Sequence, residues 1–590
     1  MTIDLPPGLV MVCGAVLIPF LRGRAKSALL LLLPLLALAA VHTAPEGTRW
    51  TFSFLGHDLA LLRVDRLSRV FGYIFSLIAF IGFVYSLEVK NDLQHTAAMV
   101  YAGSALGVTF AGDFFSLYVF WEFMALASAF LVLAGRTASA RAAALRYVLV
   151  HLAGGLVLLA GILLHLWKTG GLGVDYIGLD GAGSWLIFIG IAVNAAIPPL
   201  HPWLKDAYPE GTPTSSVFLS AFTTKSAVYL MARAYPGAEI LIWLGAVMTF
   251  FPIFYAVLEN DIRGVLSYSL INQVGFMMCG IGIGTTLAIN GTVSHAFCHI
   301  LYKALLFMAA GSVLHVTGRI RCTDLGGLYK TMPLTCIFCI VGAASISAFP
   351  LFSGFVSKSM IVSAAGHNHL IVVWLMLQFA SAGVFHHAGI KVPFFVFFSH
   401  DAHIRAKDPP RNMLAAMGAA AFLCIFLGVY PDPLYAVLPY PVDYVPYTGA
   451  HVIGQLQLLM FGALAFALLI LSGIYPAEMR AVNLDTDWFY RKGGAAVTRW
   501  ADRTLNRLNA GSERLLVHGA AAGLARLSAD APARIVLVFL SAFWRLAGIR
   551  GEELAGKQAA ASRTVREGML PAGLGALLAG VVLICAFLLV

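Results

Sequence analysis

Charged residues are scarce in this sequence. Asp, Glu, Lys and Arg make up 12% of its 590 residues, whereas 59% of the residues are hydrophobic. Soluble domains carry about 25% charged residues, so this chain has too little polar surface to cover a water-soluble body. Apolar runs of about 20 residues, the length that crosses the hydrocarbon of a bilayer, recur along the chain instead. Because backbone polar groups must be satisfied within the hydrocarbon, we expect an all-α polytopic membrane protein.

Clustered cysteines and nucleotide-binding loops are also lacking. The eight cysteines are scattered, and the one close pair, Cys336 and Cys339, lies in an apolar run without a second pair to complete a zinc site. No glycine-rich loop follows a strand, and no Cys cluster could hold an iron–sulfur centre. We therefore expect no metal, no cofactor and no redox site in this chain.

Basic residues exceed acidic ones and give a net charge of +10, but they lie in short loops between apolar runs. This placement is typical of membrane topology and argues against a nucleic-acid partner. The first apolar run is followed by Arg22, Arg24 and Lys26. Because a signal peptide has the reverse order, with its basic residues first, we expect this run to remain as a span.

We predict about sixteen transmembrane helices. Their ranges are 8–22, 27–42, 65–88, 97–112, 114–134, 143–167, 183–203, 213–235, 238–258, 264–286, 290–315, 332–364, 368–398, 411–430, 450–474 and 571–590. The loops richest in Lys and Arg follow the first, fifth, eleventh and thirteenth spans, so all four lie on one face. If that face is cytoplasmic, both termini are periplasmic in a bacterial inner membrane.

Two of these spans contain helix-breaking prolines. The seventh contains Pro198 and Pro199, and the twelfth contains Pro350. Proline removes an amide donor and clashes with the preceding turn, so each helix should open within the membrane. Paired interruptions of this kind are typical of inverted repeats around an ion site near the midplane. The alternative is that the prolines only kink their helices.

Residues 477–570 mix regular charges with apolar residues, including the series Arg499, Arg503, Arg507 and Arg514. The stretch is too polar to span a bilayer and too apolar for a disordered tail. It predicts an amphipathic helical segment at the membrane interface, followed by a last span at 571–590. A small soluble lobe is the alternative.

Few ionisable residues lie inside the predicted spans, where a charge costs about 2.5–3.5 kcal/mol on insertion scales. The candidates for a proton relay are Glu122, Lys225, His295, His299, Lys303 and Lys358, with His386, His387 and Lys391 as possible additional members. Steps of four place His295, His299 and Lys303 on one helix face, and histidine titrates near neutral pH. Each residue alone could be structural, a lysine by reaching the interface and a histidine by hydrogen bonding in the core. Their occurrence on five helices in an ordered series favours a relay.

The same residues carry a family resemblance. The matching stretches are Trp121-Glu122, Pro199-Leu200-His201, Trp203-Leu204, Asp206-Ala207, Thr224-Lys225, Asp261-Ile262, Tyr268-Ser269, the His295/His299/Lys303 triplet with Ala304-Leu305-Leu306-Phe307, Gly354-Phe355 and Ser357-Lys358. In this order and spacing, residues 60–400 resemble the antiporter-like membrane subunits shared by respiratory complex I and Mrp-type sodium/proton antiporters, and most of all the D-subunit group of those antiporters.

The resemblance implies an architecture and a path. The domains it implies are N-terminal spans in 1–96, inverted five-helix repeats at 97–235 and 238–398, further spans in 411–474, a lateral helical segment at 477–570 and the last helix at 571–590. It also implies two half-channels joined by a hydrated axis. By position, Glu122 resembles the family's fifth-helix acid, Lys225 its eighth-helix lysine, Lys303 its central lysine and Lys358 its twelfth-helix lysine, with His295 and His299 between lysines.

One position departs from the family pattern. The family places a lysine in the seventh helix to pair with the fifth-helix acid, and here that position is Asn194. An amide carries no charge, so it cannot form an ion pair with Glu122. Either Lys225 takes over the partnership, or the first half-channel works differently or not at all.

These observations predict a proton-translocating subunit of a multi-subunit Na⁺ or K⁺/proton antiporter, with other membrane subunits, the bilayer, protons and monovalent cations as its partners. Alternatives are a proton-pumping subunit of a complex I-like NADH-quinone oxidoreductase or a membrane-bound hydrogenase, a scaffold that has lost transport, and a proton-coupled partner in inorganic-carbon uptake. The sequence alone does not choose among them.

Overall fold

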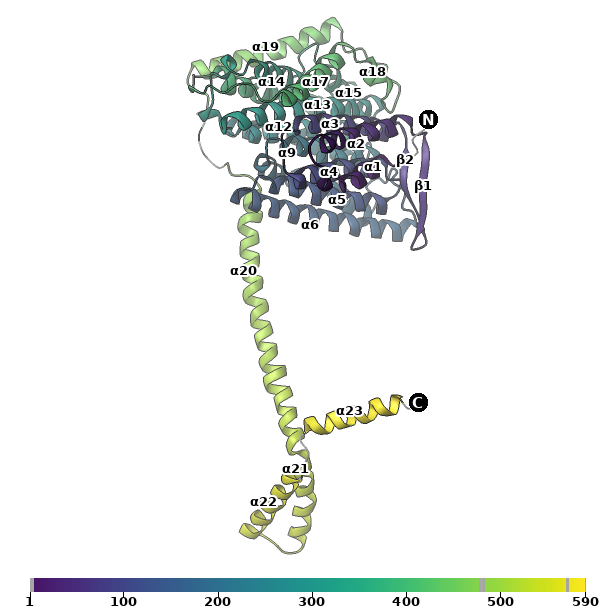
Figure 1. The fold of residues 1–590 in the computed structure, drawn as a ribbon, viewed down its shortest axis with the longest axis vertical. Helices are drawn as coiled ribbons and strands as arrows, with labels where there is room; N and C mark the ends of the chain where they lie inside the picture. Colours follow the sequence, from purple (N-terminus) through teal and green to yellow (C-terminus); the bar gives the residue numbers. More distant parts are fainter. Residues whose placement is uncertain (1–4, 477–478, 480–482, 569–571, 589–590) are drawn as a thin grey trace. The chain divides into compact units, whose positions relative to one another are not determined.

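A computed structural model describes residues 5–476, 479, 483–568 and 572–588. The chain forms two compact units, residues 1–487 and 488–590. Helices make up most of both units, and those of the first unit run side by side (Figure 1). The prediction of an all-α polytopic chain is therefore confirmed.

The helices of the first unit follow one another in the order of the predicted spans. The first half holds α1 (Pro7–Ala15), η1 (Ile18–Phe20), α2 (Gly23–Thr43), α3 (Arg66–Tyr85), α4 (Asp92–Phe110), α5 (Phe114–Leu133), α6 (Ala138–Thr169), α7 (Ala182–Asn194), α8 (Pro202–Ala207), η2 (Tyr208–Glu210), α9 (Ser215–Ala221) and α10 (Thr223–Ala234). The second half holds α11 (Glu239–Leu258), α12 (Ile262–Ile283), α13 (Thr286–Thr317), η3 (Cys322–Asp324), η4 (Leu328–Lys330), α14 (Pro333–Ile346), α15 (Ser353–His367), α16 (Ile371–Val384), the π-helices η5 (Phe385–Lys391) and η6 (Phe394–Phe398), α17 (Arg411–Val429), α18 (Asp432–Ala436) and α19 (Gly449–Leu471).

Among the described residues, eleven helices are long and apolar enough to cross a membrane, and three shorter apolar helices begin at Pro7, Ala182 and Pro333. Ten of the eleven coincide with predicted spans, and the eleventh lies in the helical stretch Asp487–Leu546. The remaining predicted spans correspond to the three shorter helices, to α4, to the pair α9 and α10, and to the last helix. The structural count by length is lower than sixteen because several spans are short or interrupted.

Side-chain contacts between loops agree with the predicted alternation of the spans. Loops that follow odd-numbered spans contact one another, as in Lys26–Asp92, Lys205–Glu259 and Asn260–Thr323. Loops and helix ends on the even-numbered side do the same, as in Arg63–Asp175, Arg233–Asp65 and Asn290–Tyr440. A helix added or omitted in the prediction would have mixed the two sets.

An antiparallel hairpin that the sequence analysis did not predict joins α2 to α3. It consists of β1 (Gly47–Phe54) and β2 (His57–Val64) with Phe54 opposite His57, and it lies at one end of the helices (Figure 1). Leu55 and Gly56 both have positive φ, at 52° and 77°, as a two-residue type I′ turn requires. Strand β2 contains the apolar run Leu59 to Leu62, and Leu59, Leu62 and Val64 are buried.

Both predicted interruptions are present. The seventh span ends as α7 at Asn194 and resumes as α8 at Pro202, and the twelfth ends as α14 at Ile346 and resumes as α15 at Ser353. Residues just after each break, Ala196 and Ala348, have left-handed φ values of 57° and 56°. A third interruption, at Phe222 between α9 and α10, contains no proline and was not predicted.

Residues 92–234 and 239–398 have similar element lengths. Each begins with two helices of about 20 residues, continues with one of 32 residues, α6 or α13, and then has an interrupted helix. In the second tract the fifth element is α16, which continues into the π-helices η5 and η6.

The second unit contains α20 (Asp487–Ser512), the π-helix η7 (Glu513–Ala521), α21 (Ala522–Leu546), α22 (Gly551–Glu567) and α23 (Ala572–Leu588), of which α20 starts at the last residue of the first unit. Its described apolar side chains, such as Leu505, Leu515 and Ile535, are mostly exposed. Asp530–Arg566 and Ser541–Gln558 join α21 to α22. A helical segment was predicted from residue 477, but residues 477–478, 480–482 and 569–570 lie outside the described part of the chain.

Candidate functional site

The ionisable residues singled out in the sequence converge on the core of the first unit. Lys225 on α10 and His295, His299 and Lys303 on α13 are completely buried, and Lys358 on α15 is 2% exposed. Burying groups that can carry charge is costly unless they are paired or functional. Helix α13, which carries three of them, packs against α9, α12, α14, α15 and α17 and lies at the centre of the unit.

Three buried lysines donate to backbone carbonyls at interrupted or terminating helices. Lys225 Nζ donates to Ser220 O at 2.7 Å, beside the Phe222 interruption, and Lys358 Nζ donates to Ile346 O at 2.9 Å, across the α14–α15 break. The last carbonyls of a helix lack intrahelical partners and carry partial negative charge, so they attract an ammonium group. The breaks therefore supply polar partners for lysines that the hydrocarbon would otherwise exclude.

Lys391 is bound in the same way but more completely. Its Nζ lies 3.2 Å from Ala256 O, 2.6 Å from Val257 O and 2.8 Å from Glu259 O, at the C-terminal end of α11. An ammonium group has three hydrogens to donate, so these three carbonyls can use all of them. This geometry favours a structural cap for α11 over the relay role predicted as a possibility.

The five buried residues Lys225, His295, His299, Lys303 and Lys358 are called the row below. Some nitrogens of its members on α13 are hydrogen-bonded and others are not. His295 has Ser357 Oγ and Gln273 Oε1 each at 3.2 Å from a ring nitrogen, and the Tyr302 hydroxyl donates to Gln273 Oε1 at 3.1 Å. Both ring nitrogens of His299 and the Nζ of Lys303 have no hydrogen-bond partner among the described residues. Buried polar atoms of this kind normally bind ordered water, so the stretch can accept and release protons.

Electrostatic interactions connect the members of the row. Lys225 lies within reach of Lys303 and of both histidines of α13, and Lys358 also acts on both histidines. His387 on η5, whose two nitrogens are buried without described partners, is within reach of Lys303. His386 packs instead against Phe466 and Tyr475, with ring centroids 5.1 and 5.8 Å away. His387 therefore lies close enough to interact with the row, whereas His386 packs against aromatic rings instead.

Glu122 stands apart from the lysines. Among the described residues no Lys or Arg forms an ion pair with it, and its Oε1 has no hydrogen-bond partner. Helix α6 presses against it, since a Cβ added to Gly155 would lie 1.9 Å from Glu122 Oε1. Lys225 bonds to Ser220 and Thr224 and does not take over the partnership. Asn194, in the family's lysine position, is 1% exposed, and its Nδ2 has no partner among the described residues.

A cavity with a mixed polar and apolar lining reaches Lys358 from the side of α19. It has a volume of about 590 Å³ and lies between α15, α16 and α19. Lys358, Gln378, Ser381, His451 and Gln455 are among its lining residues. A space of this size, with polar groups in its lining, has room for several waters between Lys358 and the end of the helices at which α19 begins.

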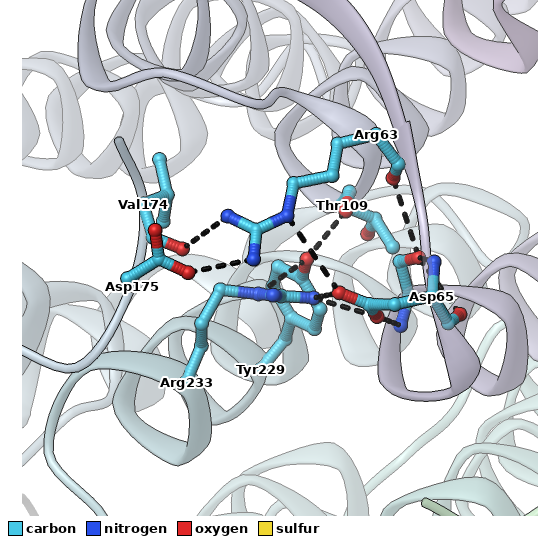
Figure 2. Close-up of polar contacts among 8 residues, drawn as sticks. Arg63, Asp65, Thr109, Val174, Asp175, Tyr229 and Arg233 are labelled. Carbon is cyan, nitrogen blue, oxygen red and sulfur yellow. Dashed lines mark hydrogen bonds and ion pairs between the residues drawn. The ribbon is translucent and has the colours of Figure 1, made fainter. Parts of the chain in front are cut away.

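A second polar cluster ties the hairpin to the helices (Figure 2). Arg233 donates to Asp65 at 2.7–2.8 Å and to the hydroxyl of Tyr229 at 2.9 Å, and Arg63 binds Asp175 at 2.6 Å. Burial opposes ionisation of Asp65, but the charge of Arg233 and the amide of Ser68 outweigh it and lower the pKa of this N-cap carboxyl. The cluster joins three chain segments and serves stability.

His151 and Gln273 are buried polar residues of this region that the sequence analysis missed. Gln273 bonds to the row directly, and His151 is 1% exposed on α6. Both lie within predicted spans, so the rule that singled out the other polar intramembrane residues would have found them.

Known proteins are similar to this chain in sequence. The family described as NADH:quinone oxidoreductase/Mrp antiporter, TM, matches residues 111–383. The chain is 30% identical over 379 residues to the N subunit of the NADH-quinone oxidoreductase of Desulforudis audaxviator, covering 58% of this chain and 75% of that protein. It is 26% identical over 577 residues to the A subunit of the Na(+)/H(+) antiporter of Alkalihalophilus pseudofirmus, covering 85% and 71%.

A solved structure shares the fold. A chain of the Mrp complex from Dietzia sp. DQ12-45-1b superposes with a TM-score of 0.65 at 20% identity, covering 79% of this chain and 98% of that one.

Proposed function

Because the chain belongs to the family of transmembrane subunits shared by NADH:quinone oxidoreductases and Mrp antiporters, we propose that it carries protons as one subunit of a multi-subunit monovalent cation/proton antiporter. The cation is Na⁺ or K⁺. The similarity to the A subunit of an Na(+)/H(+) antiporter, over 85% of this chain, supports this choice.

One observation carries the proposal. Lys225, Lys303 and Lys358 are each buried within electrostatic reach of His299, and the nitrogens of His299 and Lys303 have no described partner. A packing role would have been served by apolar residues at lower cost. A row of groups that each gain and lose a proton is what proton transfer through a dry core requires.

Transfer along the row follows from like-charge repulsion. A proton bound at Lys303 disfavours a second one at Lys225, and its departure removes that repulsion. His295 and His299 lie between the lysines and pass the proton by accepting it on one ring nitrogen and releasing it from the other. The cavity beside Lys358 supplies a hydrated route away from the row.

The proposal includes an orientation and a repeat. With the basic loops on the cytoplasmic side of a bacterial inner membrane, both termini are periplasmic and the Lys358 cavity opens toward the periplasm. The similar element lengths of residues 92–234 and 239–398 support two five-helix repeats, the predicted 97–235 and 238–398, which we take to be inverted.

The test is dissipation of a pH gradient in inverted vesicles that contain the whole assembly. Added Na⁺ or K⁺ should dissipate the gradient in wild type, and Lys303→Ala should abolish the response. The matched control is Lys168→Ala, which removes an exposed lysine at the end of α6. An unaffected Lys303→Ala variant would refute the relay and leave the scaffold alternative.

A redox-driven proton pump is the second candidate, favoured by the 30% identity to the N subunit of an NADH-quinone oxidoreductase. In that case cations have no effect, and an electron donor such as NADH builds a gradient that requires Lys303. The same vesicles therefore separate the two functions.

A further inference from the structure

His151 is a buried titratable side chain that the row described above does not use. It lies on α6 and is 1% exposed. Its Nδ1 is 3.0 Å from Tyr147 O, and a carbonyl can only accept, so Nδ1 carries the hydrogen of the neutral ring. The other nitrogen, Nε2, then presents a lone pair, and it is buried with no partner among the described residues.

The helices that carry Glu122 and Asn194, α5 and α7, both pack against the same stretch of α6. Gly155, one turn beyond His151, touches Glu122, and Gly154 packs against Val193, the residue before Asn194. The Trp203 indole, whose ring centroid is 4.5 Å from that of His151, donates to Val193 O at 2.8 Å.

Three buried polar atoms with no described partner therefore belong to α5, α6 and α7, which pack on one another here. They are Glu122 Oε1, His151 Nε2 and Asn194 Nδ2. Orphaned buried polar atoms are rare and costly, and a concentration of them indicates a place where water or a transferring proton is accommodated.

From His151, a set of hydroxyl groups leads toward Lys225. The Tyr147 ring stacks on His151 with centroids 4.0 Å apart, and its hydroxyl lies 2.9 Å from Ser128 Oγ and within reach of the Thr223 hydroxyl. Thr223 also binds Tyr101 at 2.7 Å. A hydroxyl both donates and accepts, so each can receive one proton while releasing another.

The next residue along the chain bonds to the lysine. Thr224 Oγ1 accepts from Lys225 Nζ at 3.1 Å, directly after Thr223. The hydroxyls of Tyr101, Ser128, Tyr147 and Thr223, here called the hydroxyl cluster, thus begin at the ring that stacks on His151 and end at Thr223, the residue next to the bonded pair Thr224 and Lys225. They come from α4, α5, α6 and α10, so only the folded core assembles them.

We propose that His151 carries the proton between Glu122 and Lys225, with the hydroxyl cluster as its connection. The carboxyl of Glu122 loses a proton to Nε2, which leaves a carboxylate and an imidazolium. The imidazolium releases the Nε2 proton through the hydroxyl cluster to the neutral amine of Lys225, and Glu122 is reprotonated from the aqueous side. His151 supplies the basic nitrogen that Asn194 cannot.

This inference rests on the proposed proton transport, and the experiment separates the two. In the same vesicles, His151→Gln should lower the initial transport rate at least about tenfold, because a positioned proton carrier contributes about 10²–10⁴-fold. The matched control is His165→Gln, a partly exposed histidine on the same helix. The amount of assembled complex is measured for each variant.

A second variant distinguishes proton transfer from packing. Asn194→Lys, added to His151→Gln, places a titratable amine beside the same stretch of α6 and should restore transport at least about tenfold. Loss without restoration in a fully assembled complex would assign His151 to packing. If His151→Gln transports like wild type while Lys303→Ala does not, the inference is wrong and the proposed function stands. If wild type and Lys303→Ala behave alike, the proposed function itself fails.

Discussion

Asp485 and His201 are 284 residues apart in the sequence, yet Asp485 Oδ1 lies 3.1 Å from His201 Nε2. His201 belongs to the interrupted seventh span, and Asp485 precedes α20. Two further bonds hold the same short segment, Tyr268 to Asp485 Oδ2 at 3.0 Å and Thr486 to Pro199 O at 3.1 Å. The chain leading to α20 is thus fastened to the α7–α8 break.

Asp485→Asn should loosen this attachment, because an amide removes the negative charge that His201 and Tyr268 bind. We expect faster hydrogen exchange at the amides of residues 484–486 and unchanged exchange in the core of α13. Asp443→Asn, at an exposed loop carboxyl, is the control. Equal exchange in both variants would mean that the pair does not fasten the segment.

The attachment should also depend on pH. Burial raises the pKa of Asp485, but the bonds and charge of His201, with the Thr486 amide and Tyr268, outweigh it and leave the pKa lowered. A lowered folded pKa means that the contribution is complete above the ordinary Asp value of about 3.9 and is lost as the pH falls through the folded pKa. Exchange at 484–486 should therefore stay slow at about pH 5. Loosening already at that pH would contradict the assignment.

Gly155→Ala should disturb Glu122 without changing its chemistry. The added Cβ would meet Glu122 Oε1 at 1.9 Å, so the carboxyl must move. We expect lower proton transport with an unfolding free energy reduced by about 1–3 kcal/mol, as overpacking costs. Gly418→Ala is the control, because its Cβ would meet Phe338 at an ordinary 3.5 Å. Normal transport in Gly155→Ala would show that the position of Glu122 is not critical.

Lys391→Ala separates a cap from a relay residue. Losing donors to three carbonyls at the end of α11 should lower stability by about 1–3 kcal/mol, the cost of leaving buried acceptors unsatisfied. Thermal unfolding of the purified protein measures this. Transport per assembled complex should match that of Lys330→Ala, an exposed control. Abolished transport in a variant of unchanged stability would show that Lys391 is a relay residue and not a structural cap.

Arg233→Met tests the cluster in Figure 2. The substitution removes the guanidinium that binds Asp65 and the Tyr229 hydroxyl, and we expect the free energy of unfolding to fall by about 2–3 kcal/mol. This is below the roughly 3–5 kcal/mol of a fully buried pair because the Asp65 side chain is 35% exposed. The midpoint of thermal unfolding is the measurement, with Arg319→Met as a control on an exposed loop. An unchanged midpoint would show that the hairpin is held by packing alone.

Much of this protein was determined by the sequence alone. The bilayer requires long apolar runs with internally satisfied backbones, so local composition identified the spans, and prolines identified the breaks at Pro199 and Pro350. The same constraint makes every intramembrane Lys conspicuous, which is why Lys225, Lys303 and Lys358 were found and are buried as expected.

The partners of these residues were decided by the tertiary structure. Lys391 binds carbonyls more than 130 residues away, and Glu122 contacts α6 but pairs with no lysine among the described residues. The ring of Tyr147 stacks on His151, while its hydroxyl lies beside Ser128 of another helix. The interruption at Phe222 contains no proline, so the sequence did not predict it. Burial forces each polar side chain to find a partner, but which helix supplies that partner depends on packing between elements far apart in the chain, and no local pattern encodes it.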